Sequence, residues 1–302
     1  MTVATNTKGN KPMIRRTLLA AALALAAVPA LAQTVVVGGK NFTEQQLMAE
    51  MTTQLLKAKG FTVDKRAGLG TAPLRQAQEA GQVDVYWEYT GTSLITFNKV
   101  TDKLDAAGTY ARVKELDAAK GLVWLDPSKA NNTYALAMRE ADAKSKGITS
   151  ISDLAAKMKA SPLKLGSNAE FYARPDGLRP LEQSYGIEFG RENVVRMDTG
   201  LVYQALRDSQ VDVGLVFATD GRVPAFNFVI LKDDKGYFPT YAMTPVIRKE
   251  TLDKNPKLAE ILNGLSAKLD DATMAKLNAT VDVEKKSVEE VAASFLRSGG
   301  MV

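Results

Sequence analysis

The chain has 302 residues, with 39 lysines and arginines against 34 aspartates and glutamates, and it contains neither cysteine nor histidine. Without these two residue types there can be no cysteine nucleophile, no disulfide, no Ser-His-Asp triad and no histidine-based zinc site. Only carboxylate pairs, lysine or tyrosine remain for catalysis. The composition therefore excludes most enzyme classes, and we expect no bound metal or cofactor.

Residues 1–32 have the pattern of a secretory signal peptide. Arg15 and Arg16 form a basic start, and the apolar run 17–32 ends in Ala-Leu-Ala before Gln33, which fits a cleavage site. The run is too short for a membrane span of about 20 residues. We predict that the chain is exported and that the mature protein begins at Gln33.

The basic character of the chain comes largely from this segment. Residues 1–32 contain four basic residues and no acidic ones, so the mature part has 35 basic and 34 acidic residues. A balance this close to neutral gives no electrostatic reason to expect a nucleic acid partner.

The first half of the mature chain alternates strand-like and helix-like segments. Strands are predicted at 34–39, 61–68 and 83–89, with helices at 43–60 and 72–81. In the first helix the apolar residues Leu47, Met51 and Leu55 recur every four positions, Thr43 and Gln46 suggest a capping box, and Gly60 a C-terminal stop. This order indicates an α/β fold with a largely parallel sheet.

A second α/β unit begins near residue 132. Its predicted strands and helices end in a helical C-terminal stretch, residues 250–297. The strands are at 133–140, 163–167, 192–198, 211–221, 228–234 and 240–249, and the helices are at 150–160, 176–186 and 199–210.

Two strands of the two units share a motif. The sequence Gln-Val-Asp-Val starts at residue 82 and again at residue 210, each time before a strand that ends in an aromatic residue and a threonine-containing turn. Chance similarity is one interpretation. The other is that two related lobes present equivalent strand ends to one cleft.

Ligands in open α/β sheets bind beyond the carboxyl ends of the strands. Lys40 follows the first strand and precedes a helix, where its ammonium and the free backbone N–H groups would favour an anion; the alternative is a solvated lysine in a tight turn. Gly38-Gly39-Lys40 lacks the spacing of a phosphate-binding loop.

Aromatic residues also gather at strand ends. Tyr86 is expected to pack in the core, whereas Tyr89 lies at a strand end, and Tyr134, Tyr172, Phe217 and Tyr241 lie at corresponding ends. Each alone is better explained by packing. Four rings in one cleft would form a box for a cation that cannot donate hydrogen bonds, because ring faces carry negative potential and each contact contributes about 0.5–2 kcal/mol.

Arg174 precedes a Pro-Asp-Gly turn and has two interpretations. It is either a surface residue paired with Asp176 or a fork that holds a ligand carboxylate. Asp198 and Asp220 also follow strands, and turn or cap chemistry explains them better than a glycosidase pair does.

Taken together, these segments resemble the substrate-binding proteins of osmoprotectant ABC importers, the receptors for glycine betaine, choline, carnitine and proline betaine. The similarity runs in order through nearly all of residues 34–297. The segments that carry it are GGKNFTEQ, DVYWEYTGT, NNTYALAM, FYARPDGL, DTGLVYQAL, FATDGR and DDKGYFPTYAMTPVIR.

The resemblance implies a two-lobe, venus-flytrap fold of type II with two hinge crossings. One lobe would be residues 33–131 with 236–302, and the other residues 132–235. A ligand would close the lobes for presentation to a membrane permease. No cysteine follows the signal, so the resemblance implies a free, monomeric protein in the periplasm of a Gram-negative cell.

The resemblance also implies a site. Tyr89, Tyr134 and Tyr241 match the aromatic box, and Phe217 stands where a tyrosine is common. The residues that would hold the ligand carboxylate are Lys40, Thr92 and Arg174. Asn132 stands where some relatives have aspartate; this change and Phe217 are expected to weaken or redirect binding of quaternary amines.

Two other functions are weighed against this one. A receptor for an amino acid or polyamine would need carboxylates near the ligand ammonium, for which Glu170, Asp198 and Asp220 are the candidates. An enzyme on the same two-lobe architecture, such as a transferase, is the alternative from another class; those with a covalently attached cofactor need a cysteine, which is absent.

Overall fold

A computed structural model describes residues 1–6 and 34–302. Residues 1–6 are exposed and form neither helix nor strand, and residues 34–302 form one compact unit. The predicted signal peptide, apart from those first six residues, lies outside the described residues. Within them no helix has both the length and the apolar character needed to cross a membrane.

The first sheet has five strands in the order β2-β1-β3-β10-β4. Strand β10 is antiparallel to both of its neighbours, and β1 is parallel to β2 and β3. The strands are β1 (Val35–Lys40), β2 (Val63–Leu69), β3 (Val85–Tyr89), β4 (Leu122–Trp124) and β10 (Met243–Arg248).

The second sheet repeats this plan with the order β7-β6-β8-β5-β9. Here β5 is the antiparallel strand, between β8 and β9, and β6 is parallel to β7 and β8. The strands are β5 (Tyr134–Arg139), β6 (Leu165–Ser167), β7 (Val194–Arg196), β8 (Val213–Phe217) and β9 (Phe228–Ile230).

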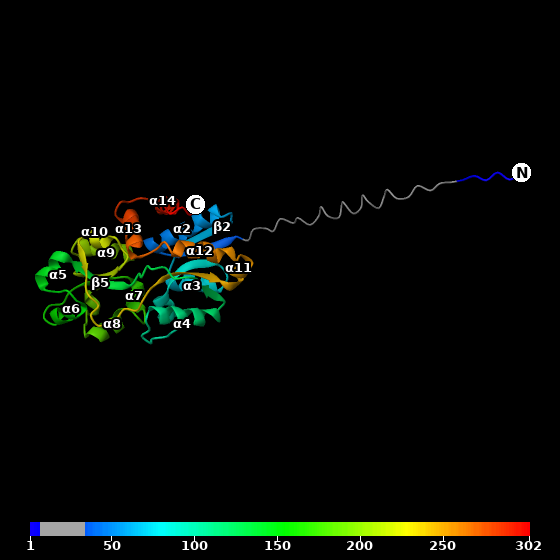
Figure 1. Cartoon of the computed structure of the whole chain (residues 1–302). Helices are drawn as coiled ribbons and strands as arrows, with labels where there is room; N and C mark the ends of the chain where they lie inside the picture. The colour runs from blue at the N-terminus through cyan, green and yellow to red at the C-terminus, as the bar shows by residue number, and fades with distance from the viewer. Residues whose placement is uncertain (7–33) are drawn as a thin grey trace. The chain divides into compact units, whose positions relative to one another are not determined.

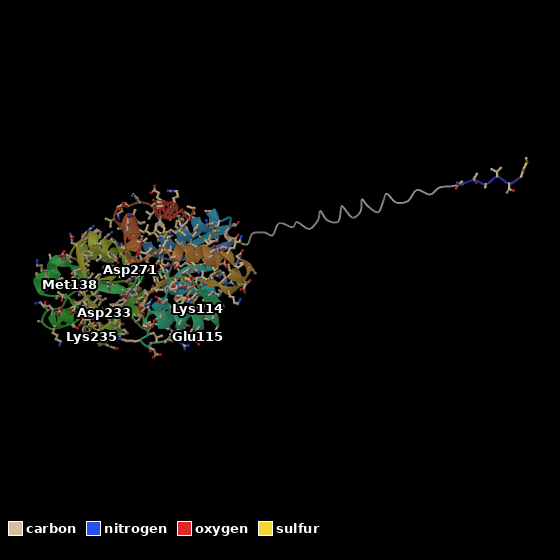
Figure 2. The ribbon with its side chains drawn as sticks, viewed as in Figure 1. Lys114, Glu115, Met138, Asp233, Lys235 and Asp271 are labelled. Carbon is tan, nitrogen blue, oxygen red and sulfur yellow. The ribbon has the colours of Figure 1, made fainter. Side chains whose placement is uncertain are left out.

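Helices cover the faces of both sheets. In Figure 1 helices α5, α6 and α8 lie around the second sheet at one end of the folded unit, and α3, α4 and α11 lie at the other. In Figure 2 Met138 of β5 lies on the first of these sides, and Lys114 of α4 lies on the second.

The helices and single turns have the following bounds. The first half contains α2 (Thr43–Ala58), α3 (Thr71–Glu79), the π-helical turn η1 (Thr92–Phe97), α4 (Ala106–Ala118), α5 (Glu140–Lys146) and α6 (Ile151–Met158). The second half contains α7 (Ala169–Ala173), α8 (Leu178–Tyr185), η2 (Arg191–Asn193), α9 (Thr199–Arg207), α10 (Arg222–Ala225), α11 (Lys249–Lys254), α12 (Lys257–Ser266), α13 (Asp271–Asp282) and α14 (Val288–Ser298).

Two segments cross between the sheets, one from β4 to β5 and one from β9 to β10. They lie side by side: Asn132 N donates to the Tyr241 carbonyl at 3.2 Å, and Met243 N donates to the Ala130 carbonyl at 3.0 Å. The predicted α/β class and the two crossings are confirmed.

The repeated Gln-Val-Asp-Val motif occupies equivalent places in the two sheets. Asp84 leads into β3 and accepts from Val36 N at 2.8 Å, and Asp212 leads into β8 and accepts from Lys164 N at 2.8 Å. Strands β3 and β8 are the central strands of their sheets. The motif therefore marks a structural repeat, and not a chance similarity.

Several local predictions fail. Phe42 is the N-cap of α2 and makes no side-chain cap bond, so the capping box at Thr43 is wrong; the Thr43 hydroxyl instead donates to Asp282 at 2.8 Å. Helix α4 and strand β4 were not predicted. The periodic residues Leu47 and Met51 are fully buried, as expected, and so is Tyr86.

Candidate functional site

A cavity of about 770 Å³ lies between the two sheets. Its wall takes residues from the ends of β1, β3, β6 and β8, from both crossings and from the start of α9. The lining includes all eight site residues predicted from the sequence: Lys40, Tyr89, Thr92, Asn132, Tyr134, Arg174, Phe217 and Tyr241.

Five aromatic rings form a continuous wall of this cavity. Phe42 stacks between Tyr89, at a centroid distance of 6.3 Å, and Phe217, at 5.3 Å. Tyr134 continues the wall, 5.0 Å from Phe217 and 5.7 Å from Tyr241, which it meets edge-on. Phe42 was not singled out from the sequence, although it lies within the Lys-Asn-Phe-Thr-Glu segment.

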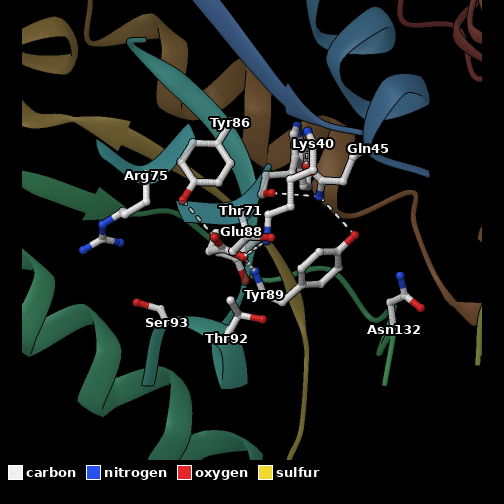
Figure 3. A network of polar contacts seen from close by, with 12 residues as sticks. Lys40, Gln45, Thr71, Arg75, Tyr86, Glu88, Tyr89, Thr92, Ser93 and Asn132 are labelled. Carbon is white, nitrogen blue, oxygen red and sulfur yellow. Dashed lines mark hydrogen bonds and ion pairs between the residues drawn. The ribbon is translucent and has the colours of Figure 1, made fainter. Parts of the chain in front are cut away.

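Lys40 is buried and paired, which excludes the solvated-turn interpretation. It is 2 % exposed, and its Nζ donates to Glu88 Oε1 at 2.5 Å. Figure 3 shows Glu88 between Lys40 and Tyr86. The Tyr86 hydroxyl donates to Glu88 Oε2 at 2.8 Å. The ammonium also lies 4.9 Å from the centroid of the Tyr89 ring. The sequence did not single out Glu88 as the partner of Lys40.

Glycines let the helices approach this corner. A Cβ on Gly38 would lie 2.6 Å from a methyl of Leu74 in α3, and one on Gly39 would lie 2.9 Å from Ala49 Cβ in α2. Gly91 has the same role on the other side, because a Cβ there would lie 2.7 Å from the Thr240 carbonyl and 3.0 Å from the Tyr241 ring. The Thr-Gly-Thr turn therefore brings Thr92 and Tyr241 together.

Arg174 is buried in the cavity wall, and the structure combines features of both interpretations of this residue. Its Nε and Nη2 donate to the two oxygens of Asp176 at 2.7 Å each. The other edge of the guanidinium, formed by Nη1 and Nη2, faces the Thr92 hydroxyl at 3.4 and 3.5 Å. The residue is paired with Asp176, as one interpretation holds, and it still presents a second fork to the cavity.

The guanidinium is also placed against the aromatic wall. Its Cζ lies 5.5 Å from the Tyr134 centroid and 6.0 Å from the Tyr241 centroid. Burial raises the pKa of the Tyr134 and Tyr241 hydroxyls, so both rings stay neutral and keep the negative faces that attract cations.

Asn132, on the first crossing, is 4 % exposed. Its Nδ2 donates to Glu44 Oε1 at 2.7 Å, and its Oδ1 is buried without a hydrogen-bond partner. Glu44 also accepts from the Tyr89 hydroxyl at 2.7 Å. The neutral amide is therefore backed by a carboxylate that sequence reasoning missed.

The three carboxylates considered for an amine ligand are not equivalent. Glu170 and Asp198 line the cavity, whereas Asp220 does not. Glu170 is engaged by the Thr71 hydroxyl at 2.9 Å and by Arg174 at 3.2 Å, and Asp220 is paired with Arg222 at 2.5 Å. Within the described residues no group of three or more acidic side chains could hold a metal ion.

Comparison with known proteins identifies the family. The family described as the substrate binding domain of ABC-type glycine betaine transport systems matches residues 33–298. The chain belongs to this family. It is therefore a solute receptor of an ABC importer and not an enzyme, and the predicted two-lobe, type II binding-protein fold is confirmed.

Individual relatives agree with this assignment. A glycine-betaine-binding protein of Pseudomonas aeruginosa is 49% identical over 292 residues, which cover 94% of each chain. The glycine betaine-binding protein YehZ of Escherichia coli is 34% identical over 89% of this chain and 92% of its own. A solved structure described as a glycine betaine/carnitine/choline ABC transporter superposes with a TM-score of 0.73 at 28% identity, over 88% of this chain and 99% of that one.

Proposed function

We propose that this receptor binds glycine betaine or a closely related quaternary ammonium osmoprotectant. The observation that carries the proposal is the five-ring wall with two basic side chains against it. The negative faces of aromatic rings attract a trimethylammonium group, which has no hydrogen-bond donor, and each good contact contributes about 0.5–2 kcal/mol. The rings of Tyr89, Tyr134, Phe217 and Tyr241 would surround the cation, with Phe42 stacked between Tyr89 and Phe217.

The ligand carboxylate would meet the edge of Arg174 that faces Thr92, together with Thr92 and Lys40, in competition with the 3.2 Å bond from Arg174 Nη1 to Glu170. Arg174 and Lys40 lie 4.9–6.0 Å from the ring centroids. Glycine betaine has a single methylene group between its ammonium and its carboxylate, so its two charges suit a cation site and an anion site this close together.

The same proposal covers the cellular role. We infer that residues 1–32 direct export to the periplasm, where the free monomer closes on its ligand and presents it to the permease subunits in the inner membrane. The lobes would be residues 33–131 with 236–302 and residues 132–235, each built around one of the two sheets.

Calorimetric titration of ligand-stripped protein, residues 33–302, tests the proposal. The panel is glycine betaine, choline, carnitine and proline betaine, with glycine as the unmethylated control. Saturable binding of a quaternary amine without binding of glycine is expected. A folded sample that binds none of the four would overturn the assignment.

A receptor for a primary amine or an amino acid is the second candidate. The observation in its favour is Asp198, whose carboxylate lines the cavity at the start of α9 and caps no backbone N–H there. Binding of glycine or a diamine in the same titrations, in place of the quaternary amines, would select this function.

A further inference from the structure

Glu44 is a buried carboxylate that has no cationic partner among the described residues. It is 3 % exposed, and none of the ion pairs among the described residues involves it. Its oxygens accept from four neutral donors: the Tyr89 hydroxyl at 2.7 Å, Asn132 Nδ2 at 2.7 Å, the Thr219 hydroxyl at 2.6 Å and Asn278 Nδ2 at 3.3 Å.

The space beside Glu44 has room for one water-sized group at most. The hollow that it lines measures about 10 Å³, at the lower limit for one water molecule. Arg222 lines the same hollow, but it is already paired with Asp220 at 2.5 Å and lies 3.3 Å from Asp282. Among the described residues, the Glu44 carboxyl is thus stabilised by hydrogen bonds from neutral groups alone.

The hydrogen bonds transmit this charge to the ligand cavity. Gln45 Nε2 donates to the Tyr89 hydroxyl at 3.0 Å, so the tyrosine proton points to Glu44. A carboxylate can only accept, so Asn132 must present Nδ2 to it, and Oδ1 is the polar atom left for a ligand. Tyr89 and Asn132 both line the cavity, and Glu44 does not.

We propose that Glu44 is the counter-charge of the ligand cation, a positioning residue that determines specificity for positive charge through Tyr89 and Asn132 without touching the ligand. The inference rests on the proposed binding of a quaternary amine. A buried carboxylate without a cation is costly, and a cation entering the aromatic wall would offset that cost. The neutral Asn132 then does not deprive the site of a negative charge, because the Glu44 carboxylate accepts a hydrogen bond from it.

Other charged and titratable groups face Glu44 and have to be separated from it in any test. Burial raises the pKa of the Glu44 carboxyl, and a bound cation would lower it again, so affinity should rise with pH and level off above that pKa. Tyr89 of β3 donates to Glu44, and Asp220, in the turn after β8, and Arg222 of α10 line the same hollow; Lys40 of β1 and Asp282 of α13 line the adjoining cavity.

The first test compares a cation with its uncharged isostere in wild type and Glu44→Gln. Glycine betaine and 3,3-dimethylbutanoate have the same shape and carboxylate, but the latter has carbon in place of the ammonium nitrogen. We expect Glu44→Gln to weaken glycine betaine binding roughly 10- to 50-fold, the effect of a charge several ångströms away in a partly buried site, and isostere binding less than about threefold. Equal losses for both ligands would overturn the inference.

Glu50→Gln is the matched control. Glu50 lies on the same helix, is also buried and loses the same charge, but it pairs with Lys65 and does not line the cavity. Its glycine betaine affinity should stay at the wild-type value. If wild-type protein binds no quaternary amine, the proposed function fails; if it does and Glu44→Gln binds equally well, only this inference fails.

The second test moves the carboxylate from position 44 to position 132. It tests the role of the Glu44 charge even if the isostere binds too weakly to titrate. In Glu44→Gln/Asn132→Asp the carboxylate and the amide exchange places across the same 2.7 Å contact. This double variant should recover most of the glycine betaine affinity that the single variant loses. No recovery in a folded double variant would contradict a role for the charge.

The wild-type pH profile needs no variant to fold. The affinity for glycine betaine should fall as the pH drops through the raised pKa of Glu44, while the affinity for the isostere, corrected for protonation of its own carboxylate, changes less. Glu44→Gln should flatten the difference between the two ligands. A difference that stays constant with pH in wild type would count against Glu44.

Discussion

Asp176 holds one edge of the Arg174 guanidinium with two hydrogen bonds of 2.7 Å and leaves the other edge facing Thr92. Arg174→Lys should therefore raise the Kd for glycine betaine about tenfold or more, because one ammonium cannot serve Asp176 and a ligand carboxylate together. Calorimetry measures the loss. Arg207→Lys, at an exposed position of α9 and paired with Asp208, is the control and should bind normally; equal affinity in both variants would place the carboxylate elsewhere.

Tyr89 contributes a ring and a hydroxyl, which two variants separate. Tyr89→Ala should raise the Kd for glycine betaine by about 2- to 30-fold, the range of one cation–π contact. Tyr89→Phe keeps the ring and loses only the hydrogen bonds of the hydroxyl with Glu44 and Gln45, so its loss of affinity should be smaller. Tyr110→Ala, in α4 and outside the cavity, controls for the size change. If a folded Tyr89→Ala variant bound glycine betaine with wild-type affinity, the Tyr89 ring would not be part of the cation site.

The sequence predicts well which residues lie at strand ends, but it predicts poorly which side chains contact them. Lys40 and Tyr89 could be placed together because each ends a strand and such ends meet at one edge of a sheet, and Phe217 ends the equivalent strand of the second sheet. Their partners could not be placed, because Glu88 and Glu44 meet them only through contacts 45–48 residues apart in the chain. The hydrophobic periodicity of a sequence does not show which way a side chain points once its strand has ended.

The aromatic wall illustrates the same limit. Phe42 follows a strand by two residues and caps a helix, so no periodicity assigned it to the cavity. Tyr172 follows a strand too, but it does not line the cavity and packs against Arg196 at 4.8 Å. Helix α4 escaped prediction because few of its residues are buried, which leaves a weak apolar pattern.

Gly91 lets the second crossing lie against the Thr-Gly-Thr turn. In Gly91→Ala the new methyl would lie 2.7 Å from the Thr240 carbonyl, so the crossing and Tyr241 must move. We expect a loss of about 1–3 kcal/mol in unfolding free energy and weaker glycine betaine binding. Gly264→Ala is the control, since nothing lies within 4 Å of that exposed position in α12 and the change should stabilise. Unchanged binding in Gly91→Ala would show that Tyr241 is dispensable.

Asp117 joins α3 and β4 around the first sheet and should stabilise the protein at neutral pH. Its buried carboxylate accepts from Arg75 at 2.6 and 2.9 Å and from Trp124 Nε1 at 2.8 Å. Burial alone would raise the pKa of Asp117, but the Arg75 guanidinium and the other donors outweigh it and lower the pKa from 3.8 to about 2. Asp117→Asn keeps the shape and leaves Arg75 buried without a full partner, so it should cost about 3–5 kcal/mol of unfolding free energy.

The pH dependence of stability isolates this pair. Because the pKa is lower in the folded state, the contribution of Asp117 is complete above pH 3.8 and is lost as the pH falls toward 2. The shift corresponds to about 2 kcal/mol. Urea unfolding followed by circular dichroism at pH 7, 4 and 2 should show this extra loss in wild type and a flatter profile in Asp117→Asn. Asp253→Asn, which breaks an exposed pair with Lys249, should follow the wild-type profile; a wild-type slope in Asp117→Asn as well would assign the acid sensitivity to other carboxylates.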